Sequence, residues 1–253
     1  MKSTKSQFLP LLEVLSFFWR IFPKRLRVQF FFLMFVLDSR GGEVRSSLRS
    51  LFLIEEKLNL VINERALRLG NGEHPKHQLI PYHNFFIRNL EGASRVLDVG
   101  CGYGAVARSI ARALPRTEVT GIENDLGRYL QAKDHVDNPP NVKFIFSDLY
   151  DYSPESKFDC IVLSNVLEHL ENRTAILVDL KRISGASTFL IRVPAFERHW
   201  TIPLRRDLGM NYFTDDDHKI EHTLEEFYSE VSAAGLKVLH LETLWGEIWA
   251  ICQ

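Results

Sequence analysis

The sequence predicts an α/β protein with a mostly parallel, doubly wound sheet, preceded by an N-terminal helical segment. Between residues 95 and 193, short apolar runs alternate with segments of helical periodicity. Residues 236–252 then form two apolar runs around Trp245-Gly246, which is typical of a closing antiparallel hairpin. Residues 1–72 lack this alternation. We therefore expect a helical, Phe-rich, basic segment at 1–72 and an α/β domain at 73–253.

The expected elements alternate along the α/β domain. Strands are expected where apolar runs of strand length end at polar or glycine residues, and helices where apolar residues recur every three or four positions. The strands are 95–99, 118–122, 142–146, 158–163, 188–193, 236–243 and 247–252, and the helices are 105–114, 126–135, 174–183 and 223–234. Strands this apolar are expected to be buried on both faces of a parallel sheet.

The N-terminal segment is apolar apart from one polar stripe. Residues 8–37 hold eight of the 18 Phe residues, and we expect Pro23 to break or kink their helix. The stripe is Glu13, Ser16, Arg20, Lys24 and Arg27. Two interpretations remain open. The helix packs on the α/β domain or a second subunit, or it lies at a membrane interface with Lys24, Arg25 and Arg27 at the lipid headgroups.

A second helix is expected at 47–69 of the N-terminal segment. Gly41-Gly42 should separate it from the first helix, and Gly70-Asn71-Gly72 should end it.

Charge is unevenly distributed along the chain. Residues 1–50 hold nine Lys or Arg against three acidic residues, a net charge of +6, so the remainder carries −7 of the total −1. This distribution favours an anionic partner, such as a membrane surface, for the basic segment alone. The acidic remainder argues against a nucleic-acid partner.

Cysteine use and hydropathy limit the location. Three widely spaced cysteines, Cys101, Cys160 and Cys252, are typical of neither a disulfide framework nor a zinc site, and favour a reducing, cytoplasmic setting. Glu13 interrupts the first apolar run, which argues against a secretory signal. The run 28–37 is too short to span a bilayer, which takes roughly 20 residues, so we expect at most membrane association.

The strongest motif is VLDVGCGYG at residues 96–104. Gly100 and Gly102 let the backbone turn tightly beside a ligand, and the following helix points its N-terminus toward that ligand. Taken alone, the glycines also satisfy the loose dinucleotide fingerprint. Three further features distinguish another ligand from a dinucleotide. They are Asp98 at the strand end, the third glycine, Gly104, and Glu123 at the end of the next strand. A carboxylate at this second strand end can accept hydrogen bonds from both hydroxyls of a ribose.

These residues resemble the S-adenosylmethionine (SAM) motif of class I methyltransferases, which have a Rossmann-like fold. FSDL at 146–149 and FDCIVLSNVLEHL at 158–170 resemble the family's later motifs. The resemblance implies that the carboxylate of Asp98 orients the methionine moiety, that Glu123 holds the ribose and that Asp148 meets the adenine amino group. The full set of implied cofactor-binding residues is Asp98, Gly100, Cys101, Gly102, Glu123, Asn124, Asp148, Leu149 and Ser164.

Flanking segments extend the resemblance to a bacterial subgroup linked to glycan biosynthesis. They are HPKH at 74–77, Tyr82-His83, and the acceptor-side insert at 194–222. The resemblance therefore implies methyl transfer from SAM to a hydroxyl of a small molecule or a glycan. A hydroxyl acceptor must lose its proton, so a histidine base is useful. His169 is the first candidate, and His218 and His222 come next.

Three alternatives remain. A metal-assisted O-methyltransferase would use a Glu-x-x-Glu-His set with a distant histidine, but Asn165 stands at the first position and is a poorer ligand than glutamate, so no metal is expected. A nicotinamide-dependent dehydrogenase would need catalytic residues that are not visible after Val193. The third is a catalytically silent SAM-fold scaffold anchored by its N-terminal helix, with an anionic membrane or a second copy as partner.

Overall fold

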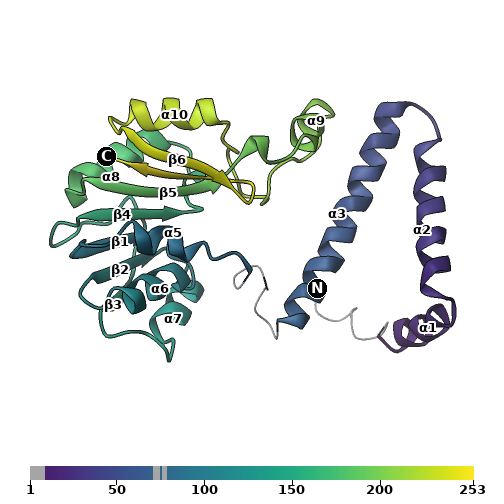
Figure 1. Cartoon of the computed structure of the whole chain (residues 1–253), viewed down its shortest axis with the longest axis horizontal. Helices are drawn as coiled ribbons and strands as arrows, with labels where there is room; N and C mark the ends of the chain where they lie inside the picture. The colour runs from purple at the N-terminus through teal and green to yellow at the C-terminus, as the bar shows by residue number, and fades with distance from the viewer. Residues whose placement is uncertain (1–8, 71–74, 76–78) are drawn as a thin grey trace. The chain divides into compact units, whose positions relative to one another are not determined.

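The chain divides into two compact units, Met1–His74 and Pro75–Gln253, called here the N-terminal unit and the α/β unit (Figure 1). The computed structural model describes the backbone of residues 9–70, 75 and 79–253. The predicted boundary between residues 72 and 73 lies outside the described residues, as do Asn71, His74, Lys76 and His77. Each unit is described by itself.

Three helices form the described part of the N-terminal unit: α1 (Leu9–Ile21), α2 (Lys24–Ser39) and α3 (Val44–Leu69). Pro23 separates α1 from α2, which confirms the predicted break. Gly41 and Gly42 lie between α2 and α3, as predicted, and α3 begins at Val44, earlier than the expected residue 47. In the part of the chain that the structure describes, no helix combines the length and the apolar composition needed to cross a membrane.

The α/β unit is built on a seven-stranded sheet in the order β3-β2-β1-β4-β5-β7-β6. Its strands are β1 (Arg95–Val99), β2 (Glu118–Glu123), β3 (Val142–Phe146), β4 (Cys160–Ser164), β5 (Thr188–Pro194), β6 (Val238–Leu244) and β7 (Glu247–Cys252). Strands β1 to β5 pair in parallel, whereas β7 pairs antiparallel with both β5 and β6. The predicted Rossmann-like sheet with a closing hairpin is confirmed.

Helices cover both faces of this sheet, because alternate residues of each strand point to opposite sides. On one face, the core joins Leu97 and Val99 of β1 to α8 (Arg173–Ser184) and α10 (Leu224–Ala233). On the other, Val96 packs with α5 (His83–Arg88) and α6 (Ala105–Ala113). Helix α7 (Leu126–Lys133) packs against β2 and β3. The order of strands reverses between β1 and β4, and open α/β sheets bind ligands at the carboxyl ends of the strands beside such a point.

Short elements follow β4 and β5 in the α/β unit. They are the 3₁₀ turns η1 (Leu167–His169) and η2 (Phe196–Arg198) and the helix α9 (Thr201–Asp207). The hairpin turn between β6 and β7 places both Trp245 and Gly246 at positive φ, 55° and 79°. Two consecutive left-handed residues are what a tight type I′ hairpin requires.

Glycine in the middle of β2 lets the loop after β1 lie directly on the sheet. A Cβ added to Gly121 would stand 2.8 Å from the Sγ atom of Cys101 and 2.8 Å from a ring carbon of Phe144. Cys101 belongs to the glycine-rich loop and Phe144 to β3, so Gly121 is the point at which these parts of the unit meet.

We expect Gly121→Ala to lower the free energy of unfolding by about 1–3 kcal/mol, because the added methyl group overpacks this contact. Urea denaturation followed by circular dichroism measures the change. Gly127→Ala is the matched control. It lies in α7, where alanine favours a helix, and its Cβ would approach only the Oδ1 atom of Asp125, at 3.2 Å, a looser contact than those at Gly121. Equal stability for both variants would show that the loop does not depend on Gly121.

Candidate active site

A cleft of about 320 Å³ opens at the carboxyl ends of the central strands. It includes five of the residues that the sequence singles out: Gly100, Glu123, Asn124, Leu149 and His169. The other residues that line it are Val99, Ile122, Arg128, Ser147, Asn165, Val166, Leu170 and Asp217. The cleft therefore joins the segments that follow β1, β2, β3 and β4, where the fold predicts a ligand.

The glycine-rich loop after β1 adopts a backbone that favours glycine. Gly100 and Gly102 have φ values of 61° and 55°, in the left-handed region. A Cβ at Gly100 would also stand 3.0 Å from the side chain of Val166, which lines the cleft opposite the loop. The loop thus presents bare backbone to the cleft, which allows a ligand to approach closely.

Glu123 ties this loop to the end of β2. Its side chain is buried, with the residue only 5% exposed. The Oε2 atom accepts a hydrogen bond from the Gly102 N–H at 2.8 Å, and the Oε1 atom accepts one from the Asp125 N–H at 2.9 Å. A carboxylate has about four acceptor positions, so two remain for a ligand. Two loops from different strands are fixed by one side chain that also lines the cleft.

Asp98 lies behind the cleft wall and is 1% exposed. Burial raises the pKa of its carboxyl group to about 7; the Ala107 N–H lowers this pKa, and nearby Glu123 raises it. Among the described residues, the Oδ2 atom has no hydrogen-bond partner. A buried acceptor without a partner costs free energy, and a cationic donor such as an ammonium group would offset that cost.

The remaining residues of the predicted cofactor set lie around the cleft without lining it. The Nδ2 group of Asn124 donates to the Oδ2 atom of Asp148 at 3.2 Å, so the segments after β2 and β3 are joined. Cys101 points its sulfur toward Gly121, and burial raises the pKa of its thiol, which makes it a poor nucleophile. The Oγ atom of Ser164 accepts a long hydrogen bond, 3.4 Å, from the Nη1 group of Arg192.

His169 brings a titratable group to the cleft. It ends η1, and its side chain is 33% exposed. Its Nδ1 atom lies 3.2 Å from the Oδ2 atom of Asp217, and its ring stands edge-on to His218 with the centroids 4.6 Å apart. Burial lowers the pKa of the imidazole, although Asp217 partly offsets this effect. The ring is therefore mainly neutral at physiological pH.

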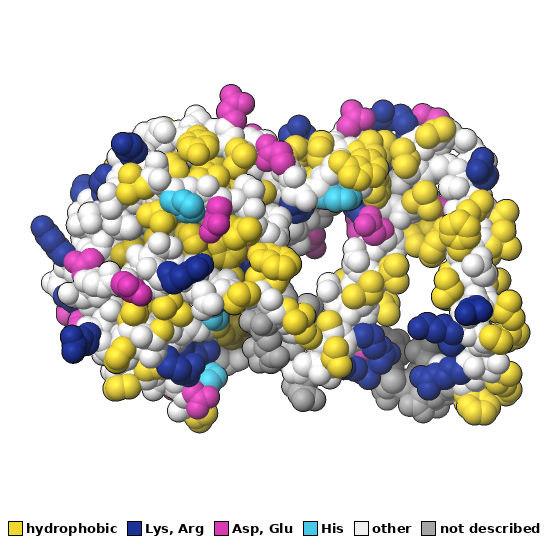
Figure 2. Space-filling model, in the orientation of Figure 1, with side chains coloured by type: hydrophobic (Ala, Val, Ile, Leu, Met, Phe, Trp, Pro, Cys, Tyr) yellow, Lys and Arg dark blue, Asp and Glu magenta, His cyan; other side chains and the backbone are white. Residues whose placement is uncertain are grey.

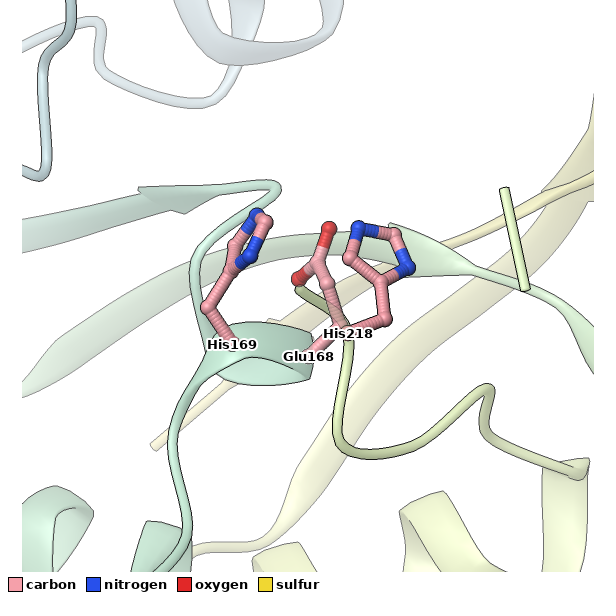
Figure 3. Close-up of side chains that lie close together, drawn as sticks. All are labelled: Glu168, His169 and His218. Atoms are coloured by element: carbon pink, nitrogen blue, oxygen red, sulfur yellow. The ribbon is translucent and has the colours of Figure 1, made fainter. Parts of the chain in front are cut away.

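Glu168, His169 and His218 form a cluster of possible metal ligands (Figure 3). One donor atom from each lies within 4.8 Å of the others. Glu168 is fully buried, burial raises its pKa to about 8, and neither carboxylate oxygen has a hydrogen-bond partner in the described part of the chain. The Oδ1 atom of Asn165 is also without a partner there. Unpaired buried oxygens of this kind fit a cation.

The segment that carries His218 is fixed beside η1. The Lys219 N–H donates to the carbonyl oxygen of Glu168 at 2.7 Å. The Nδ1 atom of His218 faces the Oε1 atom of Glu221 at 3.2 Å, and Arg198 forms an ion pair with the same carboxylate. His218 is therefore held so that its other nitrogen, Nε2, is left for a ligand. The sequence offers no local signal for this contact, because η1 and His218 come together only through the fold.

His222, the other alternative base, is not at the cleft. It is fully buried, and its Nε2 atom lies 3.1 Å from the Oε1 atom of Glu230, which also pairs with Arg173 at 2.6 Å. Burial acts to raise the pKa of Glu230, but the interactions with His222 and Arg173 outweigh it and lower the pKa. His222 thus belongs to a structural network between the acceptor-side segment, α8 and α10.

Comparisons with known proteins find similarity to methyltransferases. Residues 96–184 match the family described as a methyltransferase domain. The ubiquinone biosynthesis O-methyltransferase of Pseudoalteromonas translucida is 29% identical over 188 residues, 70% of this chain and 79% of that protein. The (S)-coclaurine N-methyltransferase of Papaver somniferum is 32% identical over 97 residues, 38% of this chain. The match covers only 27% of that second protein's length.

Solved structures show the same fold. The small RNA methyltransferase HEN1 aligns with a TM-score of 0.58 and 21% identity, over 70% of this chain and 25% of that one. The magnesium protoporphyrin IX methyltransferase ChlM from Synechocystis PCC 6803, with bound SAH, aligns with a TM-score of 0.54 and 15% identity, over 68% and 81% of the two chains. The α/β unit therefore has the fold of class I SAM-dependent methyltransferases and contains a methyltransferase domain, so the protein is an enzyme that uses SAM.

Proposed function

We propose that this chain transfers the methyl group of SAM to a hydroxyl oxygen of a small-molecule or sugar acceptor. The observation that carries the proposal is the position of His169, which lines the same cleft as Gly100 and Glu123. A candidate base thus stands beside the residues expected to hold the cofactor. Bound SAM supplies a methyl group activated by a positively charged sulfur, so the protein needs only to align the acceptor and remove its proton.

The cofactor is held, on this proposal, by carboxylates at three strand ends. Glu123 accepts hydrogen bonds from the ribose hydroxyls with its two remaining acceptor positions. Asp98 accepts one from the amino group of the methionine moiety with its unpaired Oδ2 atom. Asp148, joined to Asn124, faces the adenine amino group. The positive φ of Gly100 and Gly102 lets the loop backbone approach the ligand, and Leu149 lines the cleft beside them.

His169 removes the proton of the acceptor hydroxyl. Its lowered pKa keeps the imidazole neutral and able to accept a proton near pH 7. Asp217 lies 3.2 Å from the Nδ1 atom, and Nε2 is the nitrogen that accepts the proton on this proposal. An O-methyltransferase among the relatives supports an oxygen acceptor, whereas an N-methyltransferase relative means that the domain by itself does not decide the acceptor atom. More specifically, the acceptor on this proposal is a hydroxyl of a glycan, and the sequence of residues 194–222 supports this choice.

A metal-assisted reaction is the second candidate, favoured by the cluster described above. Glu168, His169 and His218 would hold a divalent cation, with the Asn165 amide oxygen nearby. A cation at this place would act as a Lewis acid and favour loss of the acceptor proton. His169 would then be a ligand and not the base.

The first prediction concerns Glu123→Ala, which should weaken SAH binding by about 1–3 kcal/mol, because charge-assisted hydrogen bonds to the ribose are lost. Isothermal titration calorimetry measures the change. Glu118→Ala is the matched control, since Glu118 opens the same strand but lies at its exposed end, away from the cleft. Unchanged affinity in a folded Glu123→Ala protein would remove this carboxylate from the cofactor site.

The second prediction concerns Asp98→Asn in the absence of cofactor. The pKa of Asp98 rises from 3.8 to about 7 on folding, so its ionisation lowers the free energy of unfolding progressively as pH rises from about 4 to about 7. The variant should be more stable than the wild type at pH 8, by up to about 4 kcal/mol, and no more stable at pH 4. It should also bind SAH more weakly.

Urea denaturation at both pH values tests this prediction, with the exposed Asp151→Asn as the control. An Asp98→Asn gain of the same size at pH 4 and pH 8 would show that the charge of Asp98 is not responsible.

The third prediction separates the base from the metal. With His169 as base, His169→Gln should keep SAH affinity while turnover falls by about 10²–10⁴. Wild-type turnover should rise with pH through one ionisation below pH 6.5, the usual imidazole pKa, because burial lowers the value. Turnover is measured with radiolabelled SAM and a panel of hydroxylated acceptors.

Chelation and a second variant complete this experiment. If His169 is the base, a chelator and Glu168→Gln should each leave turnover within a few-fold. Loss of activity with chelator and recovery with Mg²⁺ or Mn²⁺, together with loss in Glu168→Gln, would support the metal-assisted reaction. Near-native turnover in His169→Gln would contradict both candidates.

A further inference from the structure

The N-terminal unit exposes an unusual amount of apolar surface around the junction of α1 and α2. This surface, residues 14–37, is called here the Phe-rich elbow. None of the residues of α2 is buried. Among its most exposed apolar side chains are Phe17 at 67%, Phe32 at 61% and Ile21 at 65%. A helix that is apolar on all sides is normally covered by protein or by lipid, so the elbow needs a partner.

Ring contacts join the two helices of the elbow. The ring of Trp19 in α1 lies 5.9 Å from that of Phe30 and 5.6 Å from that of Phe31, both in α2, measured between centroids. Trp19 also contacts Phe22 beside the break, at 6.1 Å. These edge-on and tilted pairs stabilise the bend between α1 and α2. The elbow is therefore a formed structure that presents its apolar surface without first having to fold.

The charge of the elbow distinguishes between its two candidate partners. Residues 14–37 contain no acidic residue and four basic ones, which are Arg20, Lys24, Arg25 and Arg27. Figure 2 shows several Lys and Arg side chains near the N-terminal end of α2, next to hydrophobic side chains. A second copy of the elbow would bring like charges together, which destabilises a contact, whereas anionic lipid headgroups attract each of them.

The acidic residues of α3 offer little compensation for a second copy. Glu64 already pairs with Arg68 at 2.8 Å and lies 3.4 Å from Arg65. Glu55 and Glu56 likewise have interactions within the chain. The elbow itself thus carries only positive charge, which is complementary to an anionic surface.

The length of the apolar run limits the depth to which the elbow can enter a bilayer. The run 28–37 has no charged residue and forms most of α2. Ten helical residues extend about 15 Å, half of the roughly 30 Å hydrocarbon core. This length suits insertion into one leaflet, with the basic residues at the start of α2 among the headgroups and Trp19 near the interface.

We propose that the Phe-rich elbow docks this chain on an anionic lipid bilayer. The apolar side chains of the elbow enter one leaflet, and Arg20, Lys24, Arg25 and Arg27 contact the phosphate groups of the lipids. The interaction is peripheral and depends on salt. The elbow belongs to the N-terminal unit and the methyl-transfer cleft to the α/β unit, so the proposal holds whichever acceptor that cleft takes.

Co-sedimentation of the full-length protein with vesicles tests the proposal. The vesicles are phosphatidylcholine alone or with about one third phosphatidylglycerol, a strongly anionic surface. Binding should be strong to the anionic vesicles at low salt and weaker by tenfold or more at about 0.5 M salt, where charges are screened. The triple variant Arg20→Gln, Lys24→Gln, Arg25→Gln should lose on the order of tenfold to a hundredfold in partitioning.

A matched control removes three charges elsewhere: Lys57→Gln, Arg65→Gln and Arg116→Gln, all exposed and outside the elbow. This control should bind the vesicles like the wild type, and both variants should keep the wild-type circular dichroism spectrum. Lipids with brominated acyl chains give an independent readout. They should quench the fluorescence of the wild type, and much less that of Trp19→Phe, which should still bind.

Three results would overturn the proposal. The first is a full-length protein that does not bind anionic vesicles at low salt. Analytical ultracentrifugation would then show whether it is a monomer with the elbow packed on its own chain or a dimer. The second is equal loss of binding in the elbow variant and in the matched control. The third is vesicle binding in which Trp19→Phe is quenched as strongly as the wild type.

Discussion

The buried carboxylate of Glu123 holds the centre of the α/β unit together. It accepts backbone hydrogen bonds from Gly102 in one loop and from Asp125 in the next, so the position of each loop depends on the other. Asp125 in turn caps α7 by accepting from the Arg128 N–H at 2.7 Å. The glycine-rich loop, the end of β2 and the start of α7 therefore form one rigid wall of the cleft. A site that is preorganised in this way binds its cofactor without a large entropic cost.

The segment that follows β4, on the other side of the cleft, contains buried polar atoms that have no hydrogen-bond partner among the described residues. Among the described residues, neither carboxylate oxygen of the fully buried Glu168 nor the amide oxygen of Asn165 has a hydrogen-bond partner, and the backbone of Asn165 has a φ of 57°. A non-glycine residue at positive φ and an unpaired buried carboxylate each cost free energy. Both occur directly after β4, where the reaction is proposed to take place. This arrangement is typical of a functional site, in which stability is given up for chemistry.

The sequence predicts the strands well, because they depend on local patterns. The bounds of β1, β3 and β7 agree with those expected, since each is an apolar run bounded by clear turn residues. Strand β4 begins at Cys160, later than predicted, because the Asp159 carboxylate accepts from the Ser94 and Arg95 N–H groups and holds the chain before the sheet ladder begins.

Other features could not be obtained from the sequence. Helix α5 is a single short run, and α9 contains Pro203 in its first turn, so neither shows a helical period long enough to detect. The contact of His218 with η1 depends on the backbone hydrogen bond from Lys219 to Glu168. The burial of Glu168 likewise follows from packing of distant segments. Spacing along the chain predicts the order of motifs, but not which polar atoms remain without partners.

A crystal structure of the full-length protein with SAH would show whether the cofactor lies between the glycine-rich loop and the ends of β2 and β4. We expect the ribose hydroxyls within hydrogen-bond distance of Glu123, the amino group at Asp98 and the sulfur on the side of the cleft that carries His169. SAH bound outside this cleft, or with its ribose away from Glu123, would mean that these residues do not hold the cofactor.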